Sequence, residues 1–218
     1  MSSRRTLNQT EGSSNPATKF LQWKSNDKCF AYYDKAKEEN VKVELPFKFQ
    51  FLEHFHTIKG WNDASESGIY SNEVKFISKE PLTVKAFKGG TIAEGLYSDV
   101  RGQIRDAGGK YHRSVYVVDD KGNIINLQLK GAVVSAYSDF CNENEATKFE
   151  SHWIEINDVE NKKKGATKYS VPVFTIGERF NKDEMALADL KYKDVANYFD
   201  KYTAEVEVEE EEVDDLAF

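Results

Sequence analysis

The most regular pattern of hydrophobic and polar residues lies in residues 41–51, VKVELPFKFQF. Apolar side chains occupy every second position, and the positions between them carry Lys42, Glu44, Pro46, Lys48 and Gln50. A period of two over this length predicts a long β-strand with one face in the core and the other in solvent. Because proline cannot donate a ladder hydrogen bond, we expect a bulge or bend at Pro46. A strand that bends in this way favours a curved barrel over a flat sheet.

Shorter strand-like segments separated by turn residues predict hairpins. Three are expected: residues 19–24 with 28–34, residues 111–118 with 123–130, and residues 152–159 with 168–176. Residues 68–76 and 82–87 are two more strand-like stretches, and glycines mark the turns around them. The chain is therefore expected to be mainly β.

Two segments predict helices instead. Thr91-Ile-Ala-Glu94 has the sequence of a capping box and predicts a helix from about residue 92 to residue 106. Asn181-Lys-Asp-Glu184 predicts the start of a second helix by the same logic. The buried stripe of that helix would consist of residues at the i, i+3, i+4, i+7 spacing: Val195, Tyr198, Phe199 and Tyr202.

The net charge of −7 averages two different regions. Eight of the 37 acidic residues lie in the final segment, EVEVEEEEVDDLAF, so the remaining 29 face 30 lysines and arginines in residues 1–204. This division predicts a flexible arm over residues 1–18, one domain over residues 19–202 and a disordered acidic tail over residues 203–218. A near-neutral body can still carry a basic stripe, and a tethered acidic tail is present beside it at high local concentration.

The sequence also limits where the protein acts. No apolar run approaches the roughly 18–20 residues of a membrane span, and residues 1–15 lack the apolar centre of a signal peptide. We therefore expect a cytoplasmic protein with no membrane contact. Cys29 and Cys141 are far apart and lack a C-x-x-C spacing, so both are expected to be core thiols.

Motifs of the commoner catalytic chemistries are missing, including phosphate-binding loops, nucleophile elbows, zinc-protease helices and dinucleotide-binding turns. His54 and His56 share a strand face and could hold a metal, with a solvated strand face as the alternative. No acidic pair is placed to complete such a site. We expect no catalytic residues, no metal and no cofactor, which favours a binding protein over an enzyme.

Aromatic and basic residues interleave along the predicted strands. Single-stranded nucleic acid is held by a basic groove and by rings on which bases stack, each stack contributing about 1–3 kcal/mol. The candidate contacts are Trp23, Lys24, Lys28, Tyr33, Trp61, Tyr70, Lys75, Lys85, Lys88, Lys110, Tyr111, Arg113 and Tyr116. Phe47, Phe49 and Phe51 are excluded because they share the core face of their strand.

Alternation sorts some of these candidates. Tyr111 has the parity of Arg113, and Tyr116 has the parity of His112, so both tyrosines are expected to point outward. Burial in the core is the alternative for every ring in the set. Residues 162–164, Lys-Lys-Lys, form a predicted hairpin tip, either as a solvated turn or as a phosphate contact if the tip lies beside the groove.

The end of the chain resembles the C-terminal tip of single-stranded DNA-binding proteins. The bacterial form ends in Asp-Asp-Asp-Ile-Pro-Phe, and bacteriophage forms end in an acidic run closed by phenylalanine. The matching residues here are Asp214, Asp215, Leu216, Ala217 and Phe218. Ala217 replaces the proline, and Glu-rich sequence follows the last helix without a Gly/Gln/Pro-rich linker. Both differences are more similar to the phage form.

The resemblance implies an OB-fold, a five-stranded barrel carrying extra hairpins and two helices here. It implies a protein that coats single-stranded DNA without strong sequence preference during phage replication, recombination or repair. The tail would recruit a polymerase, a helicase or primase, or a recombinase through a pocket that takes the Phe218 ring and its free carboxylate. Without DNA, the tail carboxylates could occupy the protein's own groove. The compartment would be the cytoplasm of a bacterial host, and self-association is left open.

Two other classes of function remain. An acidic-tailed chaperone or adaptor for basic proteins would account for the eight carboxylates but not for the terminal Leu-Ala-Phe. A nuclease or nucleotide hydrolase without a recognised motif is the third.

Overall fold

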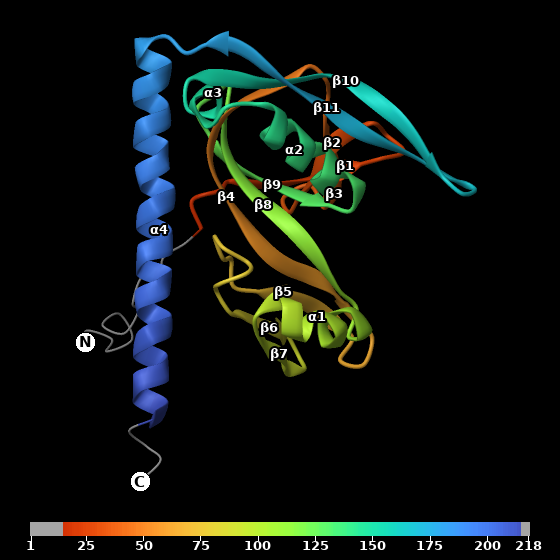
Figure 1. The fold of residues 1–218 in the computed structure, drawn as a ribbon, viewed down its shortest axis with the longest axis vertical. Helices are drawn as coiled ribbons and strands as arrows, with labels where there is room; N and C mark the ends of the chain where they lie inside the picture. The colour runs from red at the N-terminus through yellow and green to blue at the C-terminus, as the bar shows by residue number, and fades with distance from the viewer. Residues whose placement is uncertain (1–14, 215–218) are drawn as a thin grey trace.

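The computed structural model describes residues 15–214, with side chains up to Lys201, and this part of the protein is mainly β with four helices (Figure 1). The predicted fold class is therefore confirmed at that level. The strands are β1 (Lys19–Lys24), β2 (Cys29–Asp34), β3 (Glu39–Val43), β4 (Phe47–Asn62), β5 (Ser67–Ser71), β6 (Leu82–Ala86), β7 (Gly90–Gly95), β8 (Gly109–Asp119), β9 (Ile124–Lys130), β10 (His152–Lys164) and β11 (Thr167–Arg179). The helices are α1 (Tyr97–Asp106), α2 (Ala132–Glu143), α3 (Ala146–Phe149) and α4 (Lys182–Asp214).

The strands form one mixed sheet in the order β3-β2-β1-β9-β8-β4-β5-β6-β7, and β10 joins it by pairing with both β4 and β11. Among the strands described, β1 and β9 make the sole parallel pair. The path ends at β3 and β7, which do not pair with each other, so the sheet is not closed. The expected five-stranded barrel is not confirmed.

The strand predicted over residues 41–51 is two strands. β3 pairs with β2, whereas β4 begins at Phe47 and pairs with β8. The break falls at Pro46, after a cis Leu45–Pro46 peptide bond. The predicted core face is nevertheless correct around the break, because Phe47 and Phe49 are buried and Phe51 is half-buried.

All three predicted hairpins are confirmed, as β1–β2, β8–β9 and β10–β11. The third is longer than predicted, because the strands continue to Lys164 and Thr167, with Gly165 in the turn at a positive φ.

The first predicted helix is partly wrong. Residues 90–95 form β7, which pairs with β6, and α1 begins only at Tyr97. Strand pairing outweighs the local capping signal here, because it buries Ala93 in the core beneath α1. α2 and α3 were not predicted.

The helix predicted from residue 182 is α4, and it differs from expectation at its end. It continues past Tyr202 to Asp214, so most of the acidic run expected to be disordered is helical. A helix that is already nucleated extends at low cost through Glu and Ala, which are strong helix formers. Residues 215–218 of the expected tail lie outside the described residues, as do residues 1–14 of the expected arm.

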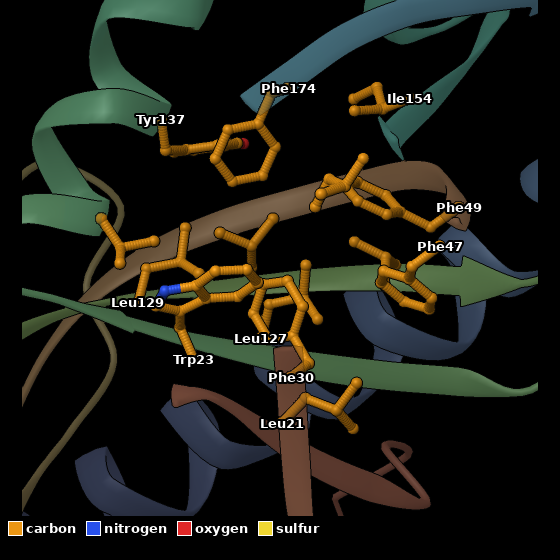
Figure 2. Packing of buried hydrophobic residues seen from close by; sticks show 14 of the residues in the cluster. Leu21, Trp23, Phe30, Phe47, Phe49, Leu127, Leu129, Tyr137, Ile154 and Phe174 are labelled. Atoms are coloured by element: carbon orange, nitrogen blue, oxygen red, sulfur yellow. The ribbon is translucent and has the colours of Figure 1, made fainter. Parts of the chain in front are cut away.

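The sheet has two distinct faces, which we call inner and outer. Along β8 the inner face carries Tyr111, Arg113, Val115 and Val117, and the outer face carries Lys110, His112, Ser114 and Tyr116. α2 and β11 cover the upper inner face, where Trp23, Phe30, Leu129, Tyr137 and Phe174 pack into the main core (Figure 2). α1 covers the inner face near Ile58.

On the outer face, α4 packs through Ala188 and Val195 against Phe55 and Tyr116. The helix thus closes one part of the outer face and leaves another part, over β1, β2 and β9, without a covering helix. Residues 15–18 lie beside α4 on this face: Ala17 is buried, and the Thr18 amide donates to the Ile124 carbonyl over 2.9 Å.

Candidate nucleic-acid interface

A groove of about 720 Å³ lies on the uncovered outer face. Its floor comes from β1 and β9, where Gln22 donates to Gln128 over 3.2 Å. Phe20 and Tyr33 line it with rings that are 40% and 57% exposed, and Lys24 and Lys35 add charge. The one acidic side chain in the lining, Asp34, accepts hydrogen bonds from backbone amides of the next turn. The groove therefore offers cations and open aromatic surface together.

Lys59 connects this groove to the unit formed by β5, β6 and β7. Its ammonium lies 5.6 Å from the centroid of the Phe20 ring, although β8 and β9 separate their strands in the sheet. The two side chains therefore approach each other over β8 and β9 on the outer face. Burial lowers the pKa of Lys59, and the nearby Glu73 opposes that shift.

The β5–β7 unit presents a second group of rings. Tyr70 and Phe87 stack with centroids 4.5 Å apart, and Phe87 is 72% exposed. Gly68 permits this stack, since an added Cβ would lie 3.2 Å from the Phe87 ring. Trp61, on β4, is also exposed, at 57%. Lys85 is the register partner of Tyr70, and Lys88 follows Phe87 directly, so both predicted lysines flank these rings.

Lys59, Lys110 and Lys130 lie near His112, Lys24 lies near Lys130, and Glu73 beside Lys59 is the one acid among the described residues that acts on these lysines. Burial lowers the pKa of Lys130, and the positive charges of Lys24 and Lys110 lower it further. The pKa of His112 is lowered first by burial and then by Lys130, Lys59 and Lys110. Within residues 15–201, none of Lys24, Lys59, Lys110 and Lys130 makes an ion pair. Like charges held together in this way are relieved by binding an anion.

Two predicted stacking residues are corrected, because both are buried. Trp23 is 7% exposed; its indole Nε1 donates to the Ser170 carbonyl over 2.9 Å and its ring meets Phe30 edge-on. Trp23 has the parity of Leu21, which points to the core, whereas Phe20 has the parity of Lys24. The alternation along β1 could therefore have identified Phe20, which is absent from the predicted contacts, as is Phe87.

Tyr116 is the second correction, since it is fully buried on the outer face beneath α4. Its hydroxyl donates to Glu73 over 2.9 Å and accepts from the Asn15 side chain over 2.8 Å. The parity prediction was correct, but the outer face is covered at this position. Burial raises the pKa of Glu73, while hydrogen bonds from Ser114 and Tyr116 and the charge of Lys59 oppose the rise.

The remaining predicted contacts lie away from the groove. Lys75 forms an ion pair with Glu53 over 2.6 Å. Tyr111 and Arg113 project from the inner face, and Tyr111 also borders a pocket of about 550 Å³ that includes Lys110 and Lys130. Lys28 lies at the β1–β2 turn, in a pocket of about 540 Å³ that also includes Lys162, Lys163 and Lys168 of the β10–β11 hairpin.

The structure thus gathers Lys24, Tyr33, Trp61, Tyr70, Lys85, Lys88 and Lys110 on or beside the outer face, and adds Phe20, Lys59, Phe87 and Lys130 to them. Among residues 15–201, no three His, Cys, Asp or Glu side chains gather closely enough to hold a metal ion. No helix in the described part of the chain is long and apolar enough to cross a membrane.

Comparison with known proteins adds no family. No protein-family model matches the chain, and neither a curated protein nor a solved structure matches it. Function must therefore be inferred from the outer face itself.

Proposed function

We propose that the protein binds single-stranded DNA along the groove on its outer face, without strong sequence preference. The observation that carries the proposal is the set of exposed rings interleaved with lysines that have no described ion-pair partner. Phosphates would be neutralised by Lys24, Lys59, Lys110 and Lys130, and bases would stack on Phe20, Tyr33 and Trp61. Every base has a π-face, so stacking of this kind tolerates sequence.

The order of connections supports an OB-type arrangement as part of the proposal. In an OB-fold, the first strand pairs with the second and fourth, and a helix often joins the third to the fourth. β4 pairs with β8 and β10, β8 pairs with β9, α2 lies between β9 and β10, and β10 pairs with β11. In this assignment β1 and β2 are added beside β9. The sheet would then correspond to an OB-fold whose barrel is not closed.

The OB assignment also fits the position of the groove. Such folds bind oligonucleotides on the face of their second and third strands, between the loops that follow the first and fourth strands. The corresponding strands here are β8 and β9. The corresponding connections are the insertion from β5 to α1, which carries Tyr70 and Phe87, and the β10–β11 turn, which directly follows Lys162, Lys163 and Lys164 at the end of β10.

The acidic end supports a role in recruitment. Its proposed partners are replication proteins of a bacteriophage, such as a polymerase, a helicase or primase, or a recombinase, with Asp214, Asp215, Leu216, Ala217 and Phe218 as the contact. The Phe218 ring, next to a run of carboxylates, suits a shallow apolar pocket with a basic rim. The preceding carboxylates would steer the end of the chain to that rim.

A titration of fluorescently labelled oligo-dT, followed by anisotropy at several salt concentrations, tests the proposed function. The expected result is saturable binding that weakens as salt rises, because bound lysines release counterions from the DNA. A mixed-sequence strand should bind comparably, and duplex DNA more weakly. Absence of saturable binding at low salt would refute the proposal. Binding of basic proteins in its place would favour the chaperone or adaptor class.

A further inference from the structure

A polar cluster occupies the inner face of the sheet between the helices that cover it. His54 and His56 from β4 lie beside Tyr111 and Arg113 from β8, and we call these four residues the waist cluster. The β4–β8 ribbon passes here from the region under α2 to the region under α1 (Figure 1). All four side chains are half-buried. Strand alternation places them on the face opposite Lys110 and His112, and none of them lines the groove, although Tyr111 also borders a pocket with Lys110 and Lys130.

The hydrogen bonds of the cluster determine which atoms donate. Arg113 Nη1 lies 3.0 Å from His56 Nε2, and because a guanidinium can only donate, Nε2 accepts. The proton of the neutral imidazole is then on Nδ1, which donates to the Tyr111 hydroxyl over 2.6 Å. The Tyr111 O–H hydrogen remains, and no residue whose side chain is described accepts it. The chain of donors therefore ends without an acceptor.

The second donor without a partner in the described part of the chain, after the Tyr111 hydroxyl, belongs to Arg113. Its Nε atom is shielded from solvent and has no hydrogen-bond partner among the described residues. The guanidinium also forms no ion pair in residues 15–201. Glu53 lies nearby on β4, but its carboxylate already binds the Lys75 ammonium over 2.6 Å and accepts from the His54 amide. A half-buried cation with an unpaired donor and no paired anion favours the binding of an anion.

The one carboxylate beside these groups among the described residues, Glu53, is already paired with Lys75. The charge of Arg113, with burial as the larger cause, lowers the pKa of His54 and of His56 to about 4, so both are neutral at pH 7. Burial raises the pKa of Tyr111, which keeps its hydroxyl protonated. His54 Nδ1 lies 3.3 Å from the hydroxyl of the fully buried Tyr137. The cluster is thus a fixed cation among neutral hydrogen-bonding groups.

We propose that the waist cluster is a binding site for a phosphate group, held by the free edge of the Arg113 guanidinium and by the Tyr111 hydroxyl. A phosphate offers several acceptor oxygens and negative charge, and the planar guanidinium edge matches two of those oxygens. The site does not depend on the proposed function of the groove, because neither Arg113 nor Tyr111 lines that groove. The group would come from free phosphate or from the end of a nucleic-acid strand.

Two-dimensional NMR of the arginine Nε–Hε resonances tests the proposal on the full chain, with inorganic phosphate as the probe. The Arg113 resonance should shift saturably with phosphate and should not shift with equal ionic strength of chloride. Arg113→Gln should lower phosphate affinity, measured calorimetrically, by about tenfold or more, as expected for loss of a charged hydrogen bond. Arg179→Gln, an exposed arginine on β11, is the matched control and should leave the affinity unchanged.

A second variant protects the test against misfolding of Arg113→Gln. Tyr111→Phe keeps the ring and removes the free hydroxyl donor, and it should weaken phosphate binding by about fivefold or more while the protein stays folded. Identical shifts with phosphate and chloride, or unchanged phosphate affinity in Tyr111→Phe and in folded Arg113→Gln, would overturn the proposal.

Oligonucleotides distinguish the two sources of the phosphate. If the end of a strand occupies the site, oligo-dT with a 5′- or 3′-terminal phosphate should bind more tightly than the same strand with hydroxyl ends, and Arg113→Gln should abolish that difference. If free phosphate is the ligand, the end of the strand should make no difference, while the shift of the Arg113 resonance with phosphate persists. A protein that binds oligo-dT but shows neither response would retain the proposed function and lose the waist site.

Discussion

The ammonium of Lys59 lies 5.6 Å from the centroid of the Phe20 ring, across two intervening strands of the sheet. This contact joins the β1 floor of the groove to β4. A base stacked on Phe20 would therefore place its phosphate within reach of a lysine whose pKa is lowered by burial. Replacing a residue of this contact therefore tests whether DNA binds along the groove.

Replacing Phe20 should weaken DNA binding without weakening the fold. Phe20→Ala should lower oligo-dT affinity by about 5- to 150-fold, the range for loss of one stacked base. Phe76→Ala is the matched control, since Phe76 is 54% exposed and carries Lys79 over its ring but lies outside the groove. Fluorescence anisotropy gives both affinities. Equal losses in the two variants would place the DNA elsewhere.

Trp23 and Trp61 should separate stability from binding. Trp23→Ala should lower the free energy of unfolding by about 3–5 kcal/mol, because it leaves a cavity in the main core and an unpaired Ser170 carbonyl. Trp61→Ala should leave stability within about 0.5 kcal/mol and weaken oligo-dT binding. Urea unfolding and a binding titration measure the two effects. A destabilised Trp61→Ala protein with unchanged affinity would assign that ring to packing.

The lysine cluster should determine the salt dependence of binding. In Lys24→Gln/Lys110→Gln/Lys130→Gln, the slope of log affinity against log salt should become shallower by about 0.7 for each phosphate that the protein no longer neutralises. Lys182→Gln/Lys193→Gln/Lys201→Gln removes the same charge from exposed positions on α4 and should change the slope little. If both triple variants change the slope alike, net charge alone would explain it.

The waist histidines should make the fold sensitive to acid. Their pKa in the folded protein, about 4, lies below the ordinary value of 6.5, so the unfolded chain binds more protons between these two pH values. The stability that the neutral histidines contribute is therefore fully present above pH 6.5 and is lost as the pH falls toward 4. The melting temperature should fall over that window. His54→Gln/His56→Gln should reduce the fall, and the difference between the two curves isolates these two histidines from other groups that titrate under acid conditions, such as Glu73 and His112. Parallel curves would show that the histidines titrate normally.

Removing the acidic end tests the proposed competition between that end and DNA. Truncation after Ala204 should raise oligo-dT affinity and change its salt slope little, because the carboxylates no longer compete with DNA for the groove. The same truncation should abolish capture of a replication partner in a pull-down. Affinity that is equal or lower after truncation would argue strongly against such competition.

Local patterns predicted the parts of the fold that depend on neighbouring residues. Alternation identified the hairpins and the core face of Phe47 and Phe49, and the stripe through Val195 identified the buried side of α4. It could not reveal that β7 would replace the first turns of a helix, because that outcome depends on pairing with β6. α2 was missed for a similar reason, since its apolar residues follow β9 with only Gly131 between them.

The candidate site was predicted less well, because alternation gives the face of a strand and not what covers that face. Tyr116 does point outward from β8, but α4, Asn15 and Glu73 arrive from distant parts of the chain and bury it. Phe20 has the parity of Lys24, which predicts that its ring points outward. Its role in the groove also depends on Lys59, which reaches the ring across the sheet. Such relationships exist only after the sheet has curved.

The parallel pairing of β1 with β9 has a consequence for how the protein is made. Lys19, Phe20 and Leu21 pair with residues 125–127, so the first strand cannot find its place until those residues have left the ribosome. Contacts between such distant positions slow folding. During synthesis the apolar side chains of Leu21 and Trp23 would remain exposed to solvent. The nascent β1–β2 hairpin is therefore the segment on which a chaperone would act first.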